Sequence, residues 1–102
     1  QIPFEAKNCN SNFHLYVLLF DFEQIGIDRN ELMTKLFDMG FQTQVHYIPV
    51  HTQPYYQNKG FKKGDYPVSE LYYQSTVSIP IYPDLLHENQ DRVIFILNEM
   101  VE

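Results

Sequence analysis

The sequence predicts a two-layer α/β fold in which helices pack on one small sheet. Strand-like and helix-like patterns alternate along the chain, in the order strand, helix, strand, long loop, short helix, strand, helix. The 102 residues suffice for one domain, and hydrophobic (44%) and charged (20%) fractions are those of globular proteins. The pattern alone leaves the direction of the strands open.

The N-terminal half predicts one strand and one helix after an irregular start. Residues 1–12 are polar, which is typical of a linker or domain edge. Phe13–Phe22 has apolar residues on both faces, which favours a central strand covered on both sides. We expect Asp28 to cap a helix, with Glu31 completing a capping box and Gly40 ending it.

The C-terminal half predicts two strands and two helices around a long connection. Phe41–Ile48 is expected to be a strand with one drier face, followed by an aromatic-rich loop over residues 50–66. Pro67 suits the first turn of a helix that runs to about Ser75. A short strand, Val77–Ile79, precedes a helix from about Glu88 to Met100. The apolar stripe expected on this last helix is Val93, Ile94, Leu97, Met100 and Val101.

Composition excludes two classes of partner. The net charge is −6, and the only dense basic group is Lys59, Lys62 and Lys63, so no nucleic-acid partner is expected. The longest apolar run lies within Phe13–Phe22 and falls far short of the ~20 residues that span a bilayer, so no membrane segment is expected.

The first residues and the single cysteine predict the cellular context. Cys9 cannot form an intrachain disulfide, which fits a reducing compartment. The start has no signal-peptide pattern, so we expect a cytoplasmic protein. It also lacks an initiator Met, and we expect the chain to begin inside a longer polypeptide or to have been processed.

The segment from His46 to Tyr56 holds the densest group of side chains suited to ligand binding or catalysis. Two imidazoles, several phenols and an amide follow a strand end, and two prolines stiffen the segment. Neutral hydrogen-bonding groups and aromatic faces suit sugars and bases. Alternatively, His46 is a polar strand residue and the tyrosines pack the loop onto the body of the domain.

Other chemistries lack their motifs. His46 and His51 are five apart across a proline turn with no cysteine or carboxylate cluster nearby, so no metal site is expected. Cys9 lies in a polar segment without a motif, which predicts a spectator thiol. Neither a Gly-x-Ser-x-Gly elbow nor a glycine-rich phosphate loop occurs. The basic segment from Lys59 to Lys63 is either a solvated loop or a lip that attracts a substrate diphosphate.

Four ordered segments resemble the C-terminal part of the DegT/DnrJ/EryC1/StrS aminotransferases, over roughly residues 13–102. They are His14–Tyr16, Arg29–Met33, Val45–His51 and Val77–Pro83. Two further segments resemble the pseudaminic-acid branch of this family. They are Gln53–Tyr56 and Gly60–Pro67.

The resemblance implies that residues 13–102 are a small C-terminal domain of the aspartate-aminotransferase (fold type I) architecture, with a mainly antiparallel sheet and flanking helices. It packs beside a large domain that binds pyridoxal 5'-phosphate (PLP), within a homodimer. In the branch named above, the enzyme moves an amino group from glutamate to C4 of a UDP-linked 4-keto-6-deoxy-N-acetylhexosamine, for surface or flagellar glycans. The Schiff-base lysine and phosphate-binding residues belong to the large domain, so we expect this chain to bind no PLP and to be inactive alone.

By the same resemblance, His46, Tyr47 and His51 border the nucleotide-sugar side of the active site. Their implied roles are positioning and hydrogen bonding, and no residue of this chain is assigned a catalytic role. His14 and Tyr16 match a structural strand. His87 stands where relatives cap the last helix with Ser or Thr, which predicts a weaker cap.

Two other functions remain open on the sequence. The chain could be a stand-alone small-molecule binding or regulatory domain that uses the tyrosine-rich loop as its pocket. It could also be an interaction domain, with an apolar patch exposed where a larger domain packs.

Overall fold

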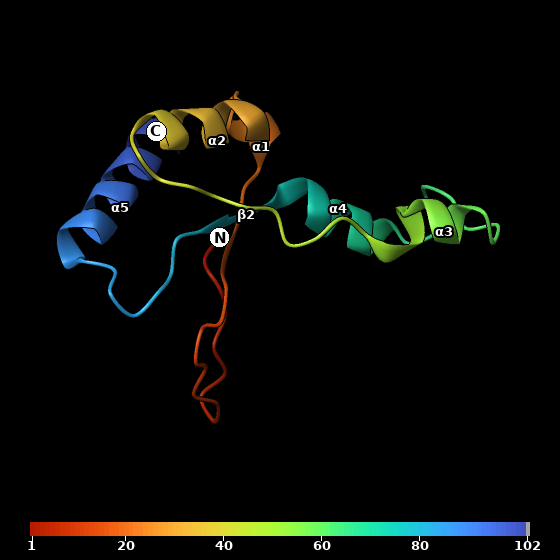
Figure 1. The fold of residues 1–102 in the computed structure, drawn as a ribbon, viewed down its shortest axis with the longest axis horizontal. Helices are drawn as coiled ribbons and strands as arrows, with labels where there is room; N and C mark the ends of the chain where they lie inside the picture. The colour runs from red at the N-terminus through yellow and green to blue at the C-terminus, as the bar shows by residue number, and fades with distance from the viewer. Residues whose placement is uncertain (102) are drawn as a thin grey trace.

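The computed structural model describes residues 1–101 and shows an elongated molecule. Its radius of gyration is 15.7 Å, against about 13 Å for a compact chain of 100 residues, and its extents are 48 × 36 × 23 Å. Figure 1 shows the reason: residues 50–75, here called the arm, project from the remaining elements, here called the body. No helix within residues 1–101 has the length and apolarity that crossing a bilayer requires.

The sheet of the body is small and antiparallel. Strand β1 (Tyr16–Leu19) pairs with β2 (Thr76–Ile79), with Tyr16 opposite Ile79 and Leu19 opposite Thr76. Gln44 bridges the other edge of β2 at Ser78. The two-layer α/β fold is therefore confirmed, but the central position is held by β2. The expectation that residues 13–22 form the central strand is wrong, because among the described residues 1–101 the outer edge of β1 meets only the backbone of Gln1, through two bonds with Leu19.

The strand predicted over residues 41–48 is reduced to the single bridge at Gln44. In the antiparallel register, residue 42 would face Pro80, which has no N–H to donate. At the other end, residue 46 would face Thr76, the first residue of β2, but no backbone hydrogen bond joins the two within residues 1–101. Residues 41–48 therefore meet β2 at Gln44 alone within that range.

Three helices belong to the body. Helix α1 (Phe22–Ile25), which the sequence pattern did not predict, is capped by Asp21. Helix α2 (Arg29–Asp38) is capped as expected, since Asp28 Oδ1 accepts from the Glu31 N–H at 2.8 Å. The Glu31 side chain pairs with Lys35 at 3.1 Å, so the reciprocal half of the predicted capping box is replaced by an i, i+4 ion pair.

Helix α5 (His87–Val101) closes the core against the sheet and α2. His87 is the first helical residue, so it does not occupy the cap position expected for it. The predicted apolar stripe is partly wrong: Ile94 is 46% exposed and Val101 also faces solvent, while Ile96 is buried. The core consists of Leu18, Leu32, Leu36, Phe41, Val77, Val93, Ile96 and Leu97.

The arm contains three short helical elements. They are η1 (Val50–Thr52), α3 (Pro54–Gln57) and α4 (Pro67–Ser75). Helix α4 is confirmed as predicted, whereas η1 and α3 were expected to be loop. Proline occupies the first turn of both α3 and α4, where its missing N–H costs nothing. Neither α3 nor α4 contains a buried residue, so the arm has almost no core of its own.

Candidate functional site

His46 is held against the sheet by one residue of β2. Ser78 exchanges two backbone hydrogen bonds with Gln44, at 2.7 and 3.1 Å. Because Gln44 and His46 lie on the same face of an extended segment, the Ser78 hydroxyl also reaches His46 Nδ1, at 2.8 Å. Ser78 is buried, so this contact fixes the imidazole and leaves Nε2 available for another partner.

Tyr47 is the exposed partner of His46. Its ring meets the His46 ring edge-on, with centroids 4.6 Å apart, yet its side chain is 67% exposed. The His46–Tyr47 peptide bond is cis. Since Tyr47 is exposed and its ring meets the half-buried His46 ring, the two side chains offer an imidazole and an aromatic face beside each other, a combination that suits hydrogen bonding and stacking.

His51 lies in a different environment, within the arm and against α4. Its side chain is only 7% exposed, and Nε2 lies 2.7 Å from Glu70 Oε1 on α4. Since an ionised carboxylate can only accept, the Nε2–H donates. The His51 ring also packs against Tyr66, with centroids 4.8 Å apart.

Glu70 joins three parts of the arm. The same Oε1 that accepts from His51 also accepts the Gly64 N–H at 2.7 Å. The His51 hydrogen bond is the largest cause that lowers the pKa of Glu70 below its ordinary 4.5, and the Gly64 and Tyr66 backbone donors lower it further, against a smaller rise from desolvation. The carboxylate is therefore charged at neutral pH and ties η1, the turn before α4 and α4 itself together.

Aromatic rings continue from this carboxylate contact to the tip of the arm. Neighbouring centroids lie 4.8–6.3 Å apart, within the usual range for aromatic pairs. The series runs from His51 through Tyr66, Phe61 and Tyr56 to Tyr55. At the tip, Lys59 lies 5.6 Å from the Tyr55 ring centre, and Lys62 and Lys63 are exposed. Rings and a basic tip therefore share one projecting segment.

Contacts at the C-terminal end of α4 tie the arm to the body. The Arg29 guanidinium donates to the Tyr73 carbonyl and lies 4.6 Å from the Tyr73 ring centre. Phe20 also donates its N–H to the Ser75 carbonyl at 2.8 Å. These contacts fix the C-terminal end of α4, whereas the Glu70 carboxylate acts nearer its N-terminal end.

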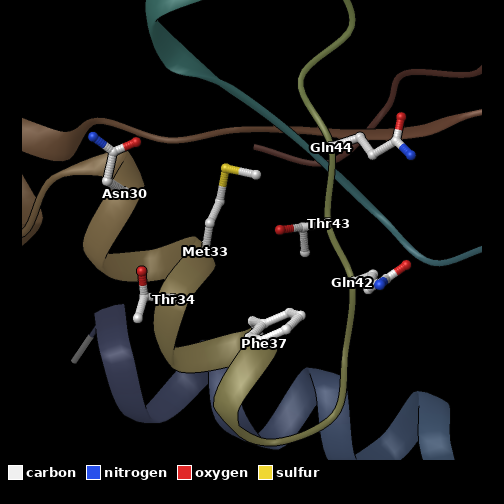
Figure 2. A pocket seen from close by; sticks show the side chains of 7 residues that line it. All are labelled: Asn30, Met33, Thr34, Phe37, Gln42, Thr43 and Gln44. Carbon is white, nitrogen blue, oxygen red and sulfur yellow. The ribbon is translucent and has the colours of Figure 1, made fainter.

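Two open grooves are present, one on the body and one on the arm. One, of about 540 Å³, separates α2 from the extended residues 42–44. Figure 2 shows Met33, Phe37 and Thr43 directed into it, while Gln42 and Gln44 point away from α2. The other, of about 560 Å³, follows the start of α4 from Asp65 to Tyr72 and is lined mainly by apolar surface. None of the three predicted site residues lines either groove.

The structure gives the three predicted residues two different settings. His46 and Tyr47 lie together beside β2, and His51 is paired with Glu70 in the arm. The sequence reading missed Ser78 and Glu70. Ser78 could have been found as the one polar residue of the predicted strand Val77–Ile79, whereas Glu70 looks like an ordinary helix-start carboxylate. Within residues 1–101, no three His, Cys, Asp or Glu side chains gather as a metal site would require.

Residues 1–98 match the DegT/DnrJ/EryC1/StrS aminotransferase family. Spore coat polysaccharide biosynthesis protein SpsC of Bacillus subtilis is 39% identical over 102 residues, which are 98% of this chain and 26% of SpsC. DesV of S. venezuelae, solved in complex with a ketimine intermediate, superimposes with a TM-score of 0.86 at 29% identity, over 99% of this chain and 26% of DesV.

A third relative shows the fold alone. PseC of Helicobacter pylori, an aminotransferase involved in pseudaminic acid biosynthesis, superimposes with a TM-score of 0.73 at 23% identity, over 86% of this chain and 23% of PseC. The chain thus spans about a quarter of the length of these relatives. The expected small sheet with flanking helices, as in PLP-dependent aminotransferases of fold type I, is confirmed. Matched over nearly its whole length, the chain belongs to the DegT/DnrJ/EryC1/StrS aminotransferase family.

Proposed function

We propose that this chain is the small C-terminal domain of a PLP-dependent sugar aminotransferase, and that it forms the nucleotide-sugar side of the active site. The longer polypeptide that would carry it is here called the parent enzyme. The main support is the contact between two side chains within the residues that match the family. The His46 imidazole is fixed by Ser78, and the neighbouring Tyr47 ring is exposed. This pair offers a hydrogen-bonding group and an aromatic face, which can bind and orient a sugar.

The proposed substrate is a UDP-linked 4-keto-6-deoxy-N-acetylhexosamine, and the proposed amino donor is glutamate. The product would be UDP-4-amino-4,6-dideoxy-N-acetyl-β-L-altrosamine, in a pathway to surface or flagellar glycans. Support comes from the fold shared with PseC and from SpsC, whose name refers to spore coat polysaccharide. Lys59, Lys62 and Lys63 would draw the diphosphate toward the arm in a chain whose net charge is otherwise negative.

In such an enzyme PLP supplies the electron sink that lets an amino group pass between an amino acid and a keto sugar. The residues of this chain do not fit that cofactor. A Schiff-base lysine needs an enclosed, desolvated setting, whereas all five lysines here are exposed and neither groove is lined by one. We therefore assign the cofactor to the large domain of the parent enzyme and derive no chemical step from this chain.

The apolar surface of the arm supports a covering partner. Val68 and Leu71 on α4 are 82% and 64% exposed, and Tyr55 on α3 is similarly open. Helices with this much exposed apolar surface are seldom left uncovered. We propose that the large domain of the parent enzyme, within a homodimer, covers them. Light scattering should then show concentration-dependent association of the chain alone, whereas the parent enzyme should stay a homodimer.

The test of this function compares the parent enzyme with the isolated chain. The parent enzyme should show the visible absorbance of bound PLP and should convert the 4-keto nucleotide sugar to an amino sugar when glutamate is added. The isolated chain should do neither. A parent enzyme that binds no PLP, or saturable sugar binding with turnover by the chain alone, would overturn the proposal.

A further inference from the structure

We propose that Glu70 is a positioning residue for the sugar side of the site, and that His51 acts through the loop it anchors rather than by touching the sugar. The inference rests on the proposed function for the nature of the ligand. Its structural part, that one carboxylate holds the arm in place, stands on the contacts of residues 50–75 alone.

His51 has the setting of an anchor rather than of a ligand-binding side chain. It is 7% exposed, its Nε2–H is committed to Glu70, and one side of its ring is covered by Tyr66. By contrast, the Tyr47 side chain is 67% exposed. A buried imidazole whose N–H already donates to a carboxylate has little to gain in binding energy from a sugar hydroxyl.

Glu70 joins by hydrogen bonds segments of the arm that otherwise meet through pairs of aromatic rings. Its Oε1 accepts from His51 in η1 and from Gly64 in the turn before α4, at 2.7 Å in each case. Because α3 and α4 have no buried residue, apolar burial cannot replace these bonds. The bonds to an ionised acceptor are the stronger kind, and both end on one oxygen.

The consequence for the site follows from chain connectivity. His51 is four residues beyond Tyr47, and buried Pro49 stiffens the link between them. Fixing His51 therefore limits where Tyr47 can point, and it also limits where the lysine-bearing tip can lie. Loss of the carboxylate should loosen both while leaving the Ser78–His46 contact in place.

The first experiment is limited proteolysis of the parent enzyme with trypsin, in which mass spectrometry follows cleavage after Lys59, Lys62 and Lys63. Glu70→Ala should accelerate these cleavages about tenfold, since the arm then opens more often. Gln74→Ala is the matched control, because Gln74 is an exposed residue of the same helix, and it should cleave at the wild-type rate. Wild-type cleavage of Glu70→Ala would overturn the structural part.

Conservative and partner variants keep the result interpretable. Glu70→Gln retains an oxygen that can accept from His51 and Gly64 and should restore most of the protection, whereas simple misfolding would not be rescued this way. The effect of the double variant His51→Ala/Glu70→Ala on the cleavage rate should be smaller than the two single effects combined, since both substitutions remove the His51–Glu70 hydrogen bond. Additive effects would contradict the pairing.

The second experiment measures the steady-state kinetics and the PLP content of the same samples. Glu70→Ala should raise KM for the nucleotide sugar roughly tenfold, change kcat less than about threefold and leave PLP absorbance unchanged. Glu70→Gln should recover most of the KM. An unchanged KM, or a fall in kcat alone, overturns the positioning role. A parent enzyme that binds no PLP would instead contradict the proposed function. The trypsin cleavage rates would still show whether Glu70 holds the arm.

Discussion

The body and the arm are built by different forces. The body buries eight apolar side chains between its sheet, α2 and α5. The arm buries none on α3 or α4 and depends on a carboxylate shared by two donors, a series of aromatic rings and the Arg29 link at its base. Apolar burial stabilises the body. The arm is held by a few polar and aromatic contacts, so we expect it to open locally at a lower free energy than the body.

The sharpest contrast is expected between two leucine truncations. Leu32 on α2 is fully buried, so Leu32→Ala should cost about 2–5 kcal/mol of unfolding free energy. Leu71 on α4 is 64% exposed, so Leu71→Ala should stay within about 0.5 kcal/mol. Urea denaturation of the full chain, with equal m-values, measures both. Similar costs for the two variants would break the distinction between body and arm.

A backbone change in the arm should act locally. Gly64 has φ +97°, and no atom lies within 4 Å of the position of an added Cβ, so Gly64→Ala adds backbone strain without a clash. That strain is about 1–2 kcal/mol, which corresponds to roughly 5–30-fold faster trypsin cleavage after Lys62 and Lys63. The midpoint of global unfolding should hardly move. A parallel fall in that midpoint would mean that arm and body unfold as one unit.

Acid should release the arm before the body. The folded pKa of Glu70 is lowered, so its contribution is complete above its ordinary value of 4.5 and is lost as the pH falls through the folded value. The Gly64 amide resonance, whose N–H donates to this carboxylate, should therefore titrate with a midpoint below 4.5. Glu70→Gln, which has no ionisable group at this position, should remove the transition. A midpoint at or above 4.5 would contradict the contact with His51.

The sequence predicted best where one local signal determined the structure. The Asp28 cap, the proline-led start of α4 and the long α5 helix each depend on a few neighbouring residues, and each is present. The central place of β2 was missed because it depends on which segments meet in space. Residues 41–48 alternate like a strand, yet only Gln44 finds a partner.

In the candidate site, too, local sequence predicted some residues and missed their distant partners. His46, Tyr47 and His51 could be selected from the local concentration of imidazoles and phenols. Their partners could not, because Ser78 and Glu70 lie 32 and 19 residues away from the histidines they contact. Long-range polar contacts carry no periodic signal, so the different settings of His46 and His51 emerge only from the folded chain.

The central claim is that this chain supplies sugar contacts and no cofactor chemistry. The most direct test is His46→Ala in the parent enzyme, with KM for the nucleotide sugar and PLP absorbance read from the same preparation. Losing one hydrogen-bonding ring should raise KM about 3–10-fold with PLP content unchanged. Equal loss of sugar affinity and PLP content would contradict the claim and make His46 a structural residue.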